Sequence, residues 1–175
     1  MSKGFPRAHE RRSKADAEVV KDRIDLTGKT VTVTATGAAI GFGSTVVHDF
    51  PEGNILLLGI GGTVGFAGPT SADLSDTWNG DFGIGSTPAS DATITGADVD
   101  IIASTAIGPA TAEAIAAARV VEAHADAGGF LDNTDGSLEV NFNLLIDAAD
   151  IADDSSVVIT LSGVLELAYI VLGDD

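Results

Sequence analysis

The stretch GFGSTVVHDFPEGNILLLGIGG, residues Gly41–Gly62, decides the fold of this chain. It contains two apolar runs typical of strands, Ser44–Phe50 and Asn54–Ile60. Between them, Pro51-Glu52-Gly53 predicts a tight turn, because proline presets φ and glycine tolerates the left-handed conformation. The second run does not alternate between apolar and polar residues. It therefore predicts a strand buried on both faces, inside a sandwich or at a subunit interface.

Strand patterns continue on both sides of this stretch. Thr30–Thr36 alternates valine and threonine until Ala35, which indicates a strand with one buried face. The last predicted strand, Val157–Leu172, is long and has a bulge or bend at Gly163. Thr77–Ile84 is either one strand bulged at Gly80 or a hairpin around Asn79-Gly80. Shorter or alternating runs predict strands at Ala92–Thr95, Val99–Ser104 and Leu138–Ile146.

Two segments have helical as well as extended patterns. Ala15–Arg23 has apolar residues near helical spacing and could form one or two helical turns. Thr111–Ala127 has high helix propensity, but its second half alternates, and a sheet can override propensity. For this segment the pattern favours a short helix or loop followed by a strand from about Ala118. The whole chain is predicted to be all-β, an antiparallel, jelly-roll-like β-sandwich with an extended N-terminal arm.

Charge divides the 175 residues into two parts. Residues 1–29 contain eight of the nine basic residues and five acids, a net charge of +3. The remaining 146 residues contain one basic residue and 21 acids, a net charge of −20. This asymmetry predicts a basic arm over residues 1–29 and a sandwich domain over residues 30–175. The alternative is a solvated tail. Nucleic acid is not an expected partner, because the acidic body repels phosphate.

No residue constellation predicts catalysis, a cofactor or a resident metal. There is no cysteine, and the three histidines lack metal-binding spacing. The glycines of GIGGTVG at Gly59–Gly65 have the wrong spacing for a dinucleotide loop. Asp132–Gly136 resembles a calcium loop, but Leu131 and Phe142 would occupy positions that require Asp and Glu. A looser cation site stays open as a prediction, with candidate ligands Asp132, Asp135, Asp150, Asp153 and Asp154.

No apolar run approaches the roughly 18–20 residues that span a membrane, so no membrane partner is expected. A basic N-terminus is present, but no apolar segment typical of a signal peptide follows it.

Three stretches together resemble a family of tailed-phage virion proteins: Gly41–Gly59, Leu131–Gly163 and Ala168–Asp175. Trp78–Pro88 and Asp98–Thr111 fit the same resemblance. The family is identified as capsid decoration, or cement, proteins. The resemblance implies a compact β-rich module, often trimeric, on the outer surface of the phage head, with the major capsid protein as its partner. It brings no catalytic motif, and the chain before Thr30 does not share it.

The predicted function is therefore structural, a virion protein that binds the outside of a head and stabilises it. Alternatives are a receptor- or glycan-binding module of a head or tail fibre, and a metal-dependent hydrolase using the acidic loops. For the first hypothesis, the arm is expected to bind the capsid or a neighbouring subunit through Lys3, Arg7, Arg11, Arg12 and Lys14. A homotrimer interface is expected at Ile55, Leu56, Leu57, Leu58 and Ile60.

Overall fold

The computed structural model describes residues 19–109, 114–122 and 129–172, with the backbone alone for 114–122. Within these residues there is no α-helix, and one 3-10 turn, η2 (Gly96–Asp98), is present. The strands are β1 (Val19–Asp25), β2 (Thr30–Thr34), β3 (Gly41–Asp49), β4 (Ile55–Ala67), β5 (Gly80–Gly85), β6 (Ile102–Ile107), β7 (Ala114–Glu122), β8 (Phe130–Leu131), β9 (Glu139–Ile146) and β10 (Ser156–Val171). The all-β prediction is confirmed.

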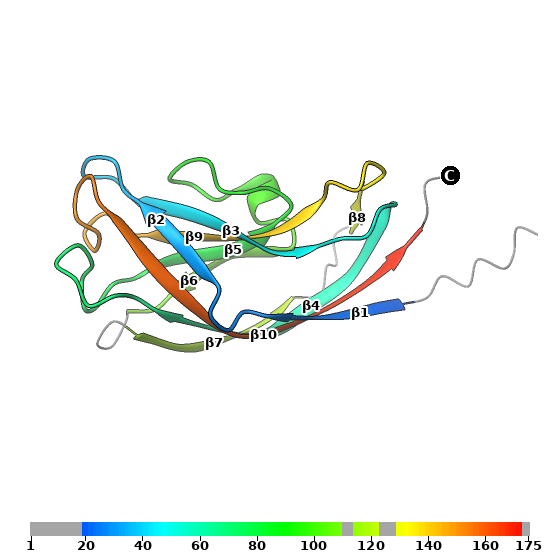
Figure 1. The fold of residues 1–175 in the computed structure, drawn as a ribbon, viewed down its shortest axis with the longest axis horizontal. Coiled ribbons are helices and arrows are strands. Elements are labelled where there is room, and N and C mark those ends of the chain that lie inside the picture. The colour runs from blue at the N-terminus through cyan, green and yellow to red at the C-terminus, as the bar shows by residue number, and fades with distance from the viewer. Residues whose placement is uncertain (1–18, 110–113, 123–128, 173–175) are drawn as a thin grey trace, which may run out of the picture.

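The strands form one ten-stranded antiparallel sheet in the order β6-β5-β9-β3-β2-β10-β4-β7. β1 pairs with β10, and β8 pairs with β4, beside this path. Figure 1 shows that the sheet curls, so that β3, β9 and β5 face β4, β7 and the second half of β10. The predicted sandwich is therefore made by one sheet folded onto itself, with the core between its two halves.

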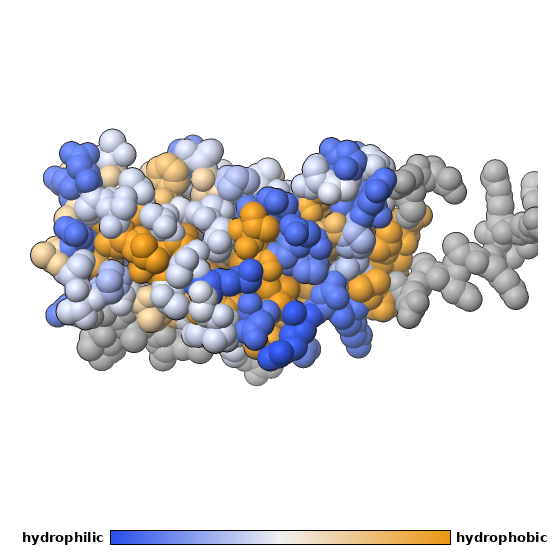
Figure 2. Space-filling view, in the orientation of Figure 1, coloured by the Kyte–Doolittle hydropathy of each residue, from blue (hydrophilic) through white to orange (hydrophobic). Residues whose placement is uncertain are grey.

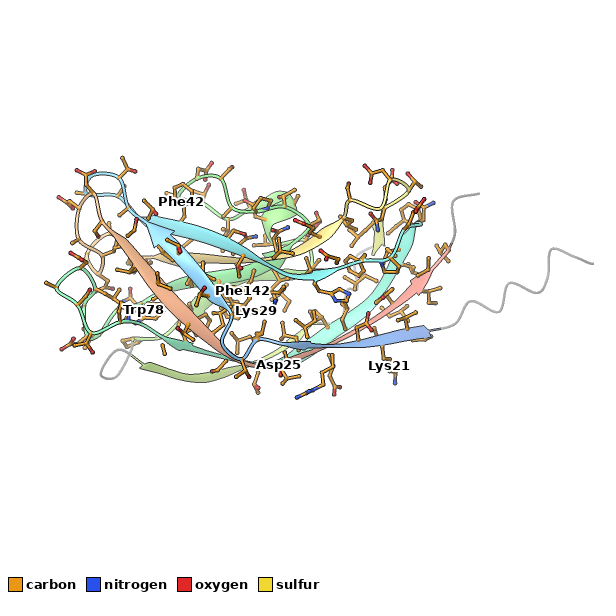
Figure 3. The ribbon with its side chains drawn as sticks, viewed as in Figure 1. Lys21, Asp25, Lys29, Phe42, Trp78 and Phe142 are labelled. Carbon is orange, nitrogen blue, oxygen red and sulfur yellow. The ribbon has the colours of Figure 1, made fainter. Side chains whose placement is uncertain are left out.

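Aromatic side chains fill the centre of this core. Phe66 of β4 approaches Phe82 of β5 and Phe142 of β9, with ring centroids 5.5 and 6.1 Å away. Phe82 and Phe142 stack at 5.5 Å, and Trp78 meets Phe66 edge-on. Figure 3 shows Phe142 pointing between the two layers. Because the rings come from both halves of the curled sheet, they hold the halves together.

The turn at Pro51-Glu52-Gly53 connects the two layers. Gly53 adopts the predicted left-handed conformation, with φ of 116°. β3 and β4 are not neighbours in the sheet, so the turn does not close a hairpin. The side chain of Asn133, which is fully buried, holds this crossing in place. Its Nδ2 donates to the carbonyls of Phe50 (3.2 Å) and Pro51 (2.7 Å), and its Oδ1 accepts from the Leu138 N–H (2.7 Å).

The bend predicted at Gly163 is where β10 changes partner from β2 to β1. Gly163 has φ of 102°, a conformation that L-residues with side chains rarely adopt. A Cβ at this position would lie 2.1 Å from the carbonyl oxygen of Thr63 on β4. Glycine is thus required twice over, by its φ and by the close approach of β4.

Three local predictions are wrong. The helix expected at Ala15–Arg23 is replaced from Val19 onward by β1, because Val20 and Ile24 face inward when the chain pairs with β10. Ala92–Thr95 is not a strand, since Asp91 Oδ1 accepts from both the N–H (2.8 Å) and the Oγ1 (2.6 Å) of Thr93 and forms a local turn. Asn79-Gly80 is not a hairpin, because β5 begins at Gly80 as a single strand between β6 and β9.

The ambiguous segment Thr111–Ala127 forms β7 over Ala114–Glu122, paired with β4. Its strand starts four residues before the expected Ala118, and no helix precedes it within the described residues. Sheet pairing therefore overrides the alanine-rich helix propensity. Residues 110–113 and 123–128 lie outside the described part.

The predicted arm of residues 1–29 is described from Val19. Ile24 and Leu26 are buried in the core, so the segment from β1 onward is part of the sheet. The prediction of an arm, with its basic residues, now concerns residues 1–18, which lie outside the described residues.

Candidate interaction surface

The structure divides the predicted interface residues between two sides of β4. Ile55, Leu57 and Ile60 point inward and are buried in the core of the single chain. Leu56 points outward, and Leu58 is 40% exposed. A bulge in β4 leaves Leu58 without a partner on β10. Ala168 pairs with Gly59, and the next residue, Tyr169, already pairs with Leu57. Of the predicted interface, only Leu56 and Leu58 are therefore available to a partner.

These two leucines belong to a larger apolar surface on the outer face of the sheet. Residues that pair across neighbouring strands share a face, and the register aligns four apolar residues in one row. The row crosses β1, β10, β4 and β8 at Val19, Ile170, Leu56 and Phe130. Leu58 and Leu172 extend it on the same face. We call these six residues the outer patch.

The outer patch is largely open to solvent. Phe130 is 52% exposed, Leu172 48% and Val19 45%, and Ile170 and Leu56 are partly exposed. Isolated exposed apolar residues are ordinary, but a contiguous apolar set across four strands is a candidate interaction surface. Figure 2 shows hydrophobic surface at this end of the molecule, where β1 and the end of β10 lie.

The sequence could not reveal the outer patch as a unit. Val19 lies in the segment read as a basic arm, and Phe130 follows a loop more than 70 residues after Leu56. Only the antiparallel register of β1, β10, β4 and β8 places these side chains in one row.

Positive charge borders the outer patch. The structure describes the side chains of three lysine or arginine residues, Lys21, Arg23 and Lys29, all on β1 or the turn after it. Lys21 and Arg23 alternate with the inward residues of β1 and are exposed on the same face as Val19. Figure 3 shows Lys21 pointing away from the sandwich. Arg23 lies opposite Glu166 on β10, whereas Lys21 lies opposite Ala168 and has no acid directly across from it.

Beneath the outer patch, the inner face of β1 carries a charged residue. The hydroxyl of Tyr169 donates to Asp22 Oδ2 at 2.7 Å, and His48 Nε2 lies 3.4 Å from the same oxygen. The ring of Phe50, itself part of the core, is in edge-on contact with both His48 and Tyr169. The hydrogen bond from Tyr169 thus attaches the inner face of β1 to β10, and an inward charge on an edge strand opposes uncontrolled sheet extension.

Tyr169 should remain protonated well beyond the pH at which an ordinary tyrosine ionises, about 10. Burial first, and then the hydrogen bond and negative charge of Asp22, raise the pKa of Tyr169. Because folding raises the pKa of Tyr169, the protonated phenol stabilises the folded protein fully at any pH below the tyrosine pKa of the unfolded chain. This stabilisation is lost as the pH rises from that value through the pKa of the folded protein. Tyr169 is the only tyrosine, so near-ultraviolet phenolate absorbance reports it directly.

We expect that absorbance to appear only when the protein unfolds in alkali. Asp22→Asn, which keeps an acceptor but removes the charge, should lower the pH of its appearance. Ionisation of the folded protein near the ordinary value would contradict the described contact.

The candidate cation ligands do not come together. Asp132 and Asp135 lie in the loop before β9, and Asp150, Asp153 and Asp154 lie in the loop before β10, at the other end of the sandwich (Figure 1). Asp132 and Asp135 border an open hollow of about 320 Å³ together with Ser86. Hydrogen bonds from the Ser137 hydroxyl and N–H lower the pKa of Asp135. The described residues contain no group of three or more His, Asp or Glu placed to hold a metal ion.

Several other predicted residues cannot be placed. The arm residues Lys3, Arg7, Arg11, Arg12 and Lys14 lie outside the described part, as do His9 and His124. No helix among the described residues has the length and apolar character needed to cross a membrane.

Comparison with known proteins gives no family assignment. No family model matches the chain, and no curated protein matches it. Among solved structures, a chain of infectious bursal disease virus, Gt strain, is 10% identical with a TM-score of 0.43, and covers 86% of this chain and 32% of its own length. A chain of the Gx strain is 11% identical with a TM-score of 0.44, and the match covers 90% of this chain and 34% of that one. A mutant VP2 protein of the same virus, from derived T=1 particles, is 12% identical with a TM-score of 0.27, and the match covers 90% of this chain and 41% of that one. The chain thus spans about a third of the length of the first two structures.

Proposed function

We propose that this chain is a structural virion protein that decorates the outside of a tailed-phage head and stabilises it as a trimer. The observation that carries the proposal is the separation of charge. The chain outside residues 1–29 has a net charge of −20, and all three described lysine and arginine side chains lie on β1 and its turn. One side of the molecule can therefore adhere to an acidic surface, while the rest repels other acidic partners.

The fold supports the same role. The body is a curled sheet closed around one core, and the described residues hold no metal-binding cluster. The resemblance of Gly41–Gly59 and Leu131–Gly163 to capsid decoration proteins points in the same direction. A protein that adds many weak contacts to a repeating shell gains large avidity from them. The major capsid protein is the partner that such a repeating surface supplies.

Deletion of residues 1–18 tests the proposal. The cut must leave β1 in place, because Ile24 and Leu26 belong to the core. We expect the truncated protein to fold normally and to bind purified heads with at least about tenfold lower affinity, because it loses Lys3, Arg7, Arg11, Arg12 and Lys14. Occupancy by quantitative gel and heat resistance of the heads are the readouts.

A charge-preserving control exchanges lysine for arginine, and arginine for lysine, at these five positions. It should bind heads like the natural protein. Full occupancy with the truncated chain would contradict the role of the arm. A copy number far below that of the capsid subunits would favour a receptor- or glycan-binding fibre module.

A further inference from the structure

We infer that the outer patch binds a second copy of this chain head to tail, against the outer face of β3 and β9 that carries Val46, Asp49 and Glu139. This inference rests on the proposed trimer and assigns its interface. It replaces the contact predicted along Ile55–Ile60, whose inward residues are used by the core.

The outer patch is chemically suited to a protein partner. Its apolar row ends at Phe130, an exposed aromatic residue of the kind enriched at the centres of interfaces. Lys21 and Arg23 stand on the same face of β1, at the border of the row. An apolar centre with a charged border is the usual anatomy of a protein–protein contact, and the border selects a partner with acidic residues around an apolar spot.

This chain presents such a surface on its opposite layer. Asp49 on β3 lies directly across from Glu139 on β9, and both carboxylates are exposed. Like charges directly opposite each other destabilise a sheet, and the described residues contain no lysine or arginine ion pair that compensates them. Val46 on β3 is 38% exposed on the same side, whereas its partner on β9, Asn141, is buried, so the exposed face consists of Val46, Asp49 and Glu139. A cation from another copy would relieve the repulsion.

The geometry favours a head-to-tail contact over a face-to-face one. If two outer patches met symmetrically, the Lys21 and Arg23 residues of both copies would border the same interface. Pairing the outer patch with the Asp49–Glu139 face brings opposite charges together instead. The two surfaces lie on different layers of one chain, so the contact is heterologous, and the proposed trimer requires that the rotation between successive copies closes the ring.

A matched pair of variants tests the outer patch in the full-length protein. Val19→Asp and Val158→Asp make the same change at strand positions of nearly equal exposure, 45% and 47%, but only Val19 belongs to the patch. By sedimentation and light scattering over a concentration series, we expect Val19→Asp and Phe130→Asp to weaken self-association at least about tenfold. Val158→Asp should associate like the natural chain. Unfolding midpoints verify that all variants are folded.

Charge exchange tests the assigned partner face. Asp49→Lys with Glu139→Lys should abolish association, and so should Lys21→Glu with Arg23→Glu. A single chain that carries all four changes should associate again, because the opposite charges are restored with reversed sign. Failure of this rescue overturns the assigned pairing. A natural chain that stays monomeric, or a Val19→Asp variant that associates normally, overturns the role of the outer patch.

Head binding is measured separately for the same variants. Full head binding by the chain without residues 1–18, with intact self-association, contradicts the proposed function, whereas a monomeric chain that still binds heads contradicts this inference alone.

Discussion

Replacing Gly163 with alanine should cost a large part of the stability of this fold. The added Cβ would lie 2.1 Å from the Thr63 carbonyl oxygen, and the residue would have to keep φ of 102°. The backbone strain costs about 1–3 kcal/mol. The forced separation of β4 from β10 costs about 1–3 kcal/mol more. Domains of this kind are stable by roughly 5–15 kcal/mol, so the urea midpoint should fall sharply. Fluorescence of the single, fully buried Trp78 follows the transition.

Two other glycines separate the causes. Gly28 has φ of 79° but nothing within 4 Å of an added Cβ, so Gly28→Ala should show conformational strain alone, about 1–2 kcal/mol. Gly80 has no left-handed φ, but a Cβ would lie 2.0 Å from the Leu145 carbonyl oxygen, so Gly80→Ala should show the close approach alone. If Gly163→Ala is no worse than Gly28→Ala, the strands at this bend are not held as close as the structure places them.

The architecture was predictable wherever one physical signal dominated. The valine–threonine alternation of Thr30–Thr34 placed Val31 and Val33 in the core, and both are fully buried. The turn at Gly53 and the bend at Gly163 were predictable because residues with side chains rarely adopt the positive φ that both glycines have. Predictions failed where a distant partner decided the outcome. β1 is extended because β10 offers an unpaired edge, and no local pattern in Ala15–Arg23 contains that information.

The candidate surface was predictable only in part, for the same reason. The run Ile55–Ile60 was predicted to be buried on both faces, but within the single chain only Ile55, Leu57 and Ile60 are buried, and Leu56 and Leu58 remain on the surface. Which strands flank them depends on register. Because β1 and β8 pair on either side of β10 and β4, Val19 and Phe130 join the patch. The basic arm stays a prediction.

Asn133→Ala should produce the second large loss of stability, although the residue lies in a loop that looks like an ordinary polar turn. Its side chain is fully buried and is the shared partner of the Phe50 and Pro51 carbonyls and the Leu138 N–H. Alanine leaves these backbone groups without their partner, at about 1–3 kcal/mol for each that water cannot reach. We expect a total loss of about 2–4 kcal/mol by urea unfolding. Asn133→Asp should not rescue it, because a carboxylate cannot donate to two carbonyls.

Asp132→Ala is the matched control, one residue away in the same loop. Asp132 Oδ1 also accepts two hydrogen bonds, from the N–H and Oγ1 of Thr134, but it is exposed, and water replaces it. Its loss should stay within about 0.5 kcal/mol. Equal effects at the two positions would show that the crossing turn does not depend on Asn133. The turn leads into β4, and Asn133 follows β8, so loss of the Asn133 hydrogen bonds should also disturb the pairing of Leu56 with Phe130. We therefore expect Asn133→Ala to weaken self-association even under conditions in which the chain remains folded.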